Sequence, residues 1–143
     1  MSAFIKLIAQ RRNGAGLWEP VGFTPEWTSY AIYGVLANQR NYAEAPFITE
    51  ARYLPSDWPA EPPYEMGRFG EWTAWADAYD LGDGVKSWLT LTELLAFDYD
   101  QTFTNLREGG QIMTVREHLG DDFFTDLHQM QAMGVERIVF RIG

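Results

Sequence analysis

The two ends of the chain alternate apolar and polar residues, and this period of two restricts the fold more than any other feature. Residues 3–11 alternate in this way, and residues 135–142 do so again. Successive side chains of a β-strand point to opposite faces of a sheet, so each end predicts a strand with one apolar face. Turn residues at 13–16 separate the first strand from residues 17–21, which predicts an opening hairpin.

Three stretches between these ends show helical spacing of apolar residues. The first is expected at residues 24–38, because a threonine that can cap a helix precedes a proline there. The second begins with Thr90 and Glu93, which have the spacing of a capping box. The third is expected to start from a cap at Asp121 or Asp122.

A second hairpin is predicted from residues 103–107 and 111–115, which flank a glycine-rich turn. The chain of 143 residues has the usual size of one domain, and no internal repeat divides it. We therefore expect one α+β domain, residues 1–143, in which a mostly antiparallel sheet of about five strands packs against about three helices.

Residues 43–87 are predicted to form a long irregular loop, because regular periodicity fades there. The segment holds five of the seven prolines and three of the six tryptophans. Irregular segments of this length are usually functional or disordered, and tryptophan is costly to leave in water. We expect this loop to pack on the domain and to determine specificity.

The acidic residues are concentrated in the same region. The net charge is −9, and residues 57–83 contribute seven acids and one arginine. A phosphate backbone is bound with cations, so direct binding of nucleic acid is not expected, whereas a basic protein surface is a suitable partner. Asp77, Asp80 and Asp83 are the candidate residues of an acidic partner surface. An ordinary solvated acidic face would give the same pattern.

The composition also restricts the compartment. The chain has no cysteine, which removes disulfides, thiol catalysis and cysteine-bound zinc, and it fits a reducing compartment. The first nine residues are too short an apolar stretch to span a membrane, and no cleavage site follows them. We expect a protein of the bacterial cytosol that needs no cofactor and forms a monomer or a small homo-oligomer.

Catalytic motifs are mostly missing from the sequence. His118 and His128 have no metal-ligand companions at a recognisable spacing. Asp98 and Asp100 follow the second helix and could share a divalent cation; alternatively they take a forked contact from an arginine or belong to a turn. They are weak candidates for metal-assisted chemistry.

A polar cluster follows the first helix and is the candidate ligand site. Arg40, Asn41 and Tyr42 carry guanidinium, amide and phenol groups, which suit a nucleotide or another polar ligand. Arg52 and Trp88 would add a cation and a stacking face if the long loop folds back over this point. The same cluster would also suit a plain helix end, with Asn41 as its cap.

Two motifs carry a resemblance to a known group of proteins. Residues 36–42 (LANQRNY) and 87–101 (SWLTLTELLAFDYDQ) resemble those of small uncharacterised accessory proteins of tailed phages and prophages. Members of that group often carry histidines at positions matched here by residues 2–4 and 84–86, where this chain has none. This difference weakens an enzymatic interpretation.

The resemblance implies a phage accessory protein with a counter-defence role. The leading hypothesis is a non-enzymatic protein that binds and sequesters a nucleotide-derived bacterial immune signal. One alternative is an anti-CRISPR-type acidic inhibitor that binds a basic surface of a host defence protein by DNA mimicry. Another is a small metal-assisted hydrolase that uses Asp98 and Asp100. The fold class by itself supports none of them.

Overall fold

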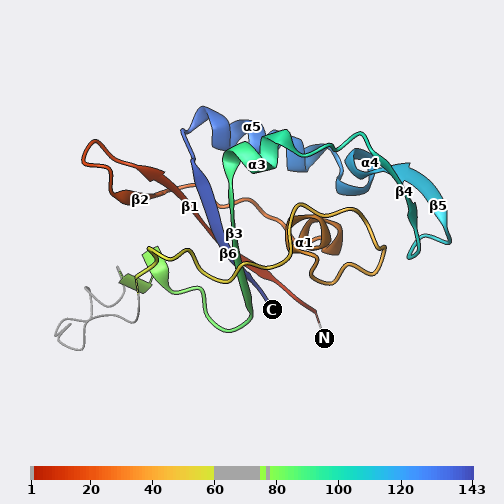
Figure 1. The fold of residues 1–143 in the computed structure, drawn as a ribbon, viewed down its shortest axis with the longest axis horizontal. Coiled ribbons are helices and arrows are strands. Elements are labelled where there is room, and N and C mark those ends of the chain that lie inside the picture. The colour runs from red at the N-terminus through yellow and green to blue at the C-terminus, as the bar shows by residue number, and fades with distance from the viewer. Residues whose placement is uncertain (1, 60–74, 77) are drawn as a thin grey trace.

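The computed structural model describes residues 2–59, 75, 76 and 78–143 as one α+β domain. Its centre is a four-stranded antiparallel sheet in the order β2-β1-β6-β3 (Figure 1). The strands are β1 (Ile5–Arg12), β2 (Trp18–Val21), β3 (Val85–Thr90) and β6 (Arg137–Ile142). A separate hairpin consists of β4 (Thr102–Asn105) and β5 (Gln111–Thr114). The predicted α+β class and both predicted hairpins are confirmed.

The two ends of the chain form the middle of the sheet. β1 pairs with β6 along six residue pairs, from Ile5↔Ile142 to Gln10↔Arg137. Backbone hydrogen bonds between Phe4 and Gly143 extend this pairing to the termini. The period-two pattern at each end therefore reflects two strands that neighbour one another and carry the core of the domain.

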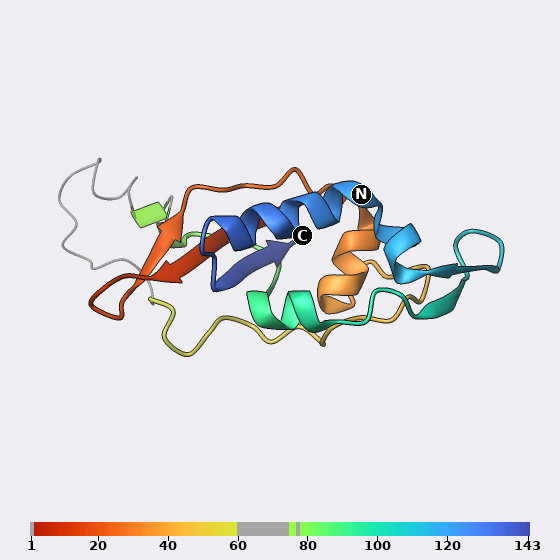
Figure 2. The same ribbon diagram turned by 90° about the horizontal axis from the view of Figure 1, so that it is seen from above.

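Four helices cover one face of the sheet, which we call the inner face: α1 (Tyr30–Ala37), α3 (Leu91–Ala96), α4 (Val115–Leu119) and α5 (Asp121–Ala132). The described residues 75, 76, 78 and 79 are also helical and do not belong to this set. Leu36, Leu94 and Phe123 from these helices belong to one buried cluster with Ile138 and Phe140 of β6. Helices α3 and α5 contact each other, and the β4–β5 hairpin lies at one end of the molecule (Figures 1 and 2).

The first helix starts later than the sequence predicts. It begins after Ser29, whose Oγ accepts a hydrogen bond from the backbone N–H of Ala31, and not at Thr24. Trp27 is buried in the predicted first turn, where its ring lies 5.1 Å from that of Phe123. Tertiary packing of this indole keeps the preceding segment extended, so a good local capping signal is overridden.

The ends of the other helices also differ from prediction. Asn38, with φ of 54°, is the C-cap of α1, and Asn41 is not. Gly120 precedes α5 without a side-chain cap, and Asp121 and Asp122 lie inside its first turn. Their charges there still favour the positive end of the helix dipole. The predicted capping box of Thr90 and Glu93 is present at the start of α3.

The predicted irregular segment ends earlier than Ser87, because β3 already begins at Val85. The backbone N–H of Tyr53 donates to the carbonyl of Lys86, and that of Arg52 donates to the Ser87 hydroxyl. Residues near 52 therefore cover the outer edge of β3, which would otherwise expose unpaired backbone groups. The segment packs on the domain there, and residues 60–74 and 77 lie outside the described part of the chain.

None of the helices within the described residues is long and apolar enough to cross a membrane.

Candidate binding cleft

The sheet face away from the helices, here called the outer face, carries three rows of side chains. Strand register defines these rows as Lys6–Arg141–Lys86, Ile8–Val139–Trp88 and Gln10–Arg137–Thr90. The first row is cationic, the second is apolar and the third is polar. This face therefore offers charge and apolar area together, whereas the inner face is filled by the main core.

Arg137 is the buried cation of the outer face. Its exposed fraction is 5%. Its Nε donates to Oε1 of Gln10 at 2.7 Å, and its Nη1 donates to Oδ1 of Asp57 at 2.9 Å. The guanidinium carbon lies 3.8 Å from the centre of the Trp18 ring. Hydrogen bonds, an ion pair and a cation–π contact together offset the loss of water around this charge.

Asp57 connects the long loop to this cluster. Its Oδ2 accepts a hydrogen bond from Nε1 of Trp18 at 2.6 Å, while its other oxygen pairs with Arg137. Partial burial alone would raise the pKa of Asp57. The hydrogen bonds from Arg137 and Trp18 favour the ionised form more strongly, so the pKa lies below its ordinary value. The carboxylate is therefore a charged anchor rather than a proton donor.

A cleft of about 760 Å³ lies over this cluster. Arg12, Trp18, Trp88, Thr90, Gln131 and Arg137 are among its lining residues. Nη2 of Arg137 makes no hydrogen bond to a described residue, and no buried side-chain nitrogen in the described part of the chain lacks a partner. Nη2 is therefore not completely buried, and Arg137 is a lining residue of the cleft.

Arg12 provides a second guanidinium at the cleft. Its guanidinium carbon lies 4.8 Å from the centre of the Trp18 ring, and it forms no ion pair with any described residue. The nearby carboxylate of Glu136 accepts a hydrogen bond from the backbone N–H of Arg12. The cleft thus presents one buried and one exposed guanidinium beside the same indole.

The structure brings together two of the residues that the sequence proposes for ligand binding, Arg52 and Trp88. Nη1 of Arg52 donates to Oε1 of Glu93 at 2.8 Å, Nη2 pairs with the other oxygen, and the guanidinium carbon lies 4.8 Å from the centre of the Trp88 ring. Arg52 hydrogen-bonding holds the pKa of Glu93 at about 2. Arg52 therefore orients Trp88 at the cleft while its own charge is compensated.

The other three proposed ligand residues lie beside α1, a helix of the inner face. The Asn41 amide donates to the carbonyl of Ala45 at 2.9 Å and accepts from the Ala45 N–H at 3.0 Å, so it shapes a loop. Arg40 and Tyr42 are exposed, and a hydrogen bond with Tyr42 raises the pKa of Arg40. No contact joins these three residues to Arg52 or Trp88 in the described structure.

The proposed acidic surface is described only in part. Asp77 lies outside the described residues, whereas Asp80 and Asp83 are exposed. The carbonyl of Asp80 accepts from Nζ of Lys6, and that of Leu81 accepts from Nε of Arg141 at 2.8 Å. This part of the acidic segment therefore sits against the cationic row of its own sheet.

Asp98 and Asp100 adopt the turn-and-arginine arrangement. Oδ1 of Asp98 accepts the backbone N–H of Asp100 at 3.1 Å, and Oδ1 of Asp100 pairs with Nε of Arg116 at 2.8 Å. The hydrogen bond from Arg116 lowers the pKa of Asp100. Within the described residues no group of three acidic, histidine or cysteine side chains could hold a metal ion.

Sequence reasoning missed Gln10, Arg12, Trp18 and Arg137. The available signal was weak, because Gln10 and Arg137 are only two of several polar residues in these strands, among them Lys6 and Arg141. The register that brings them together joins residues 127 positions apart, which no local pattern specifies.

Comparison with known proteins gave no matching family model, no similar curated protein and no similar solved structure. The class of the protein is therefore defined by its fold alone, an α+β domain with a four-stranded antiparallel sheet. Its function has to be argued from the geometry of the cleft.

Proposed function

We propose that this protein is a non-enzymatic binding protein that sequesters a nucleotide-type ligand in the outer-face cleft. The observation that supports this best is the guanidinium of Arg137, which is stacked on Trp18, lines the cleft and has no described hydrogen-bond partner for Nη2. A fixed guanidinium fork suits a phosphate or the edge of a base, and an indole face suits a planar ring. Trp88 supplies a second aromatic surface.

The charge of the cleft selects among nucleotide-type ligands. Arg12 and Arg137 face the carboxylates of Asp57 and Glu136, so these four lining residues carry no net charge. A ligand with several phosphates would gain little attraction there and would meet both carboxylates. A ring with a single negative charge, as in a cyclic mononucleotide, suits this lining best.

The chemistry of the cleft supports sequestration over turnover. Asp57 is held ionised by two hydrogen bonds, so it is poorly suited to general acid catalysis. A protein that binds such a ligand without converting it removes the ligand from solution. The resemblance to phage accessory proteins suggests a biological role for this binding. The protein would act in counter-defence by sequestering a nucleotide-derived immune signal of the host.

Thermal unfolding with a panel of nucleotides tests the proposal. The panel contains cyclic mononucleotides, cyclic di- and trinucleotides and ADP-ribose derivatives. A ligand present at one hundred times its dissociation constant should stabilise the fold by about 2.7 kcal/mol, which is a shift of several degrees. We expect the largest shift with a cyclic mononucleotide, and we expect that compound to be recovered unchanged.

Two neighbouring arginines provide a matched pair of variants. Arg12→Gln should weaken binding about tenfold or more, the loss expected for a charge-assisted hydrogen bond. Arg11→Gln is the control, because Arg11 pairs with Glu19 and does not line the cleft. Equal affinities of the two variants, or no shift with any compound, would contradict the proposal. In the second case a pull-down with Asp80→Asn/Asp83→Asn would test the acidic-inhibitor alternative.

A further inference from the structure

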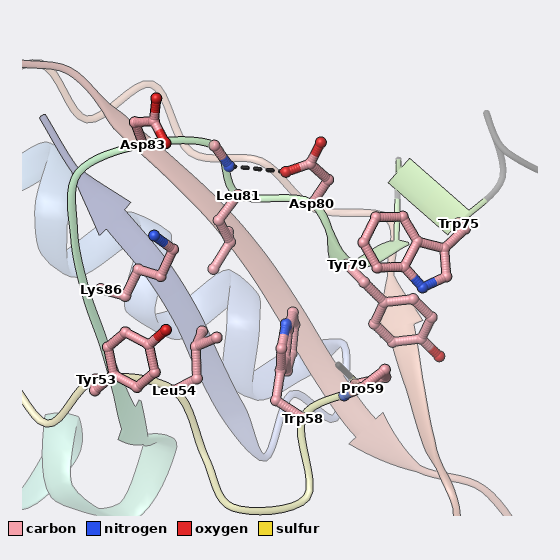
Figure 3. Close-up of a pocket in the computed structure, with 11 residues that line it drawn as sticks. Tyr53, Leu54, Trp58, Pro59, Trp75, Tyr79, Asp80, Leu81, Asp83 and Lys86 are labelled. Carbon is pink, nitrogen blue, oxygen red and sulfur yellow. Dashed lines mark hydrogen bonds between the residues drawn. The ribbon is translucent and has the colours of Figure 1, made fainter. Parts of the chain in front are cut away.

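A second pocket lies on the outer face beside the cationic row of the sheet. Its volume is about 430 Å³. One side is aromatic and contains Trp58, Trp75 and Tyr79, while Tyr53 lies beside Lys86, away from Trp75 and Tyr79 (Figure 3). The other side contains the loop from Asp80 to Asp83 and the side chain of Lys86. The pocket shares none of the arginines of the proposed nucleotide cleft.

The aromatic side is held in place by ring contacts. The Trp58 and Tyr79 rings meet edge to face with centroids 5.5 Å apart, and the Trp75 and Tyr79 centroids are 6.2 Å apart. The side chain of Tyr53 is exposed. Its backbone has a φ of +68°, a conformation that is costly for a bulky residue. The hydrogen bond from its backbone N–H to Lys86 keeps this ring at the pocket.

Opposite charges line the pocket without neutralising each other. Asp80, Asp83 and Lys86 all line it, and no ion pair joins Lys86 to either acid in the described structure. The nearby cations Lys6 and Arg141 donate to the carbonyls of Asp80 and Leu81, so they hold the loop on the sheet. Oδ1 of Asp80 accepts the backbone N–H of Gly82 at 3.0 Å, so the ammonium of Lys86, the carboxylate of Asp83 and the second oxygen of Asp80 are left for a ligand.

We propose that this pocket binds a zwitterionic amino acid with an aromatic or large apolar side chain. The carboxylate of the ligand pairs with the ammonium of Lys86, and its ammonium pairs with Asp83 or Asp80. The ligand side chain lies against the Trp58 and Tyr79 rings, which also attract the ammonium through their faces. A phosphate ligand would meet two carboxylates and one cation, so this site differs in chemistry from the nucleotide cleft.

Calorimetric titration with three related compounds tests each charge separately. L-Phenylalanine carries both charges, L-phenylalaninamide lacks the carboxylate, and 3-phenylpropionate lacks the ammonium. We expect L-phenylalanine to bind at least about tenfold more tightly than either analogue, because each analogue leaves one charge of the pocket without a partner.

Variants assign each preference to a residue. Lys86→Gln should abolish the preference for L-phenylalanine over its amide but keep the preference over 3-phenylpropionate. Asp80→Asn/Asp83→Asn should have the opposite effect. Glu108→Gln, which changes an exposed acid outside this pocket, should preserve both preferences.

Equal affinity of the three compounds, no binding of L-phenylalanine, or no change of preference in the pocket variants would overturn this assignment. Arg12→Gln is expected to leave the L-phenylalanine titration unchanged. The amino-acid proposal can therefore hold if the nucleotide proposal fails. The nucleotide proposal can likewise hold if the amino-acid proposal fails.

Discussion

Arg137 shows how a single cation can remain charged in a nearly buried position. Gln10, Asp57 and Trp18 replace the water that its guanidinium loses on folding. Each partner comes from a different segment of the chain, so the position of the guanidinium depends on the whole outer face. Because a buried charge is costly unless every contact is made, such a group adds little stability by itself. Its Nη2, which has no described hydrogen-bond partner, fits instead the proposed role in recognition.

A contact between Gly34 and Asn41 gives a prediction at the same scale. A Cβ atom on Gly34 would lie 2.8 Å from Oδ1 of Asn41, the oxygen that accepts from the Ala45 N–H. Gly34→Ala should therefore destabilise the fold by about 1–3 kcal/mol, although alanine normally favours a helix. Urea denaturation measures this loss.

Gly14→Ala is the control for that measurement, since no atom lies within 4 Å of the added Cβ. The double variant Gly34→Ala/Asn41→Ala should be less destabilised than the sum of its single changes, because the two shortest contacts, to Oδ1 and Cγ of Asn41, disappear with the amide and only the 3.1 Å contact to its Cβ remains. A stabilised Gly34→Ala variant would show that the Asn41 amide does not have the role assigned to it.

At the scale of an element, the start of α3 connects helix capping to the cleft. The Thr90 hydroxyl caps the helix by accepting a hydrogen bond from the backbone N–H of Glu93 at 3.1 Å. In turn, Oε1 of Glu93 accepts a hydrogen bond from the backbone N–H of Thr90 at 3.0 Å. Glu93 also holds Arg52, which lies over Trp88. The capping box thus fixes the start of α3. Through Glu93 and Arg52 it also fixes the Trp88 ring, which lines the cleft.

Thr90→Ala should destabilise the protein by about 1 kcal/mol, the usual loss for an N-cap residue. It should also weaken binding of the nucleotide ligand, because Thr90 lines the cleft and because Glu93 loses part of its support. Thr114→Ala breaks the equivalent box of α4, which has no link to Arg52. Denaturation and titration together separate the two effects: both variants should lose stability, and only Thr90→Ala should lose affinity. Equal affinities would show that the cap does not act on the cleft.

The same elements show what a sequence can predict. Period-two alternation identified β1 and β6, and capping chemistry identified the start of α3, because those signals depend on neighbouring residues. The start of α1 was predicted wrongly because burial of Trp27 prevails over a local cap. The cleft was not predicted because Trp18 and Asp57 meet only after a loop folds over the sheet.

At the scale of the whole molecule, acidic residues outnumber basic ones, and several of the acids form ion pairs with arginines. Asp57 pairs with Arg137, Glu93 with Arg52 and Asp100 with Arg116. The first two of these pairs attach residues 52–57 to the sheet and to α3. Some carboxylates thus hold the long segment on its own domain, and because each pair is neutral, the net charge of −9 comes from the remaining residues.

These pairs make stability depend on pH in a defined direction. A hydrogen bond from Arg52 is the main cause that lowers the pKa of Glu93 to about 2 from its ordinary value of 4.5. The unfolded chain therefore takes up a proton at a higher pH than the folded chain does. The contribution of Glu93 to stability is complete above about pH 4.5 and is lost as the pH falls towards about 2.

Glu93→Gln should consequently flatten the acid side of the stability profile. Thermal unfolding at neutral pH should show a less stable variant, because the Arg52 pair is gone, and the difference from the unmodified protein should shrink as the pH is lowered through that window. Glu108→Gln, an exposed acid outside these pairs, should follow the unmodified protein throughout. A constant difference between Glu93→Gln and the unmodified protein at all pH values would mean that Glu93 is protonated equally in both states. The Arg52 pair would then not be what holds residues near 52 against β3.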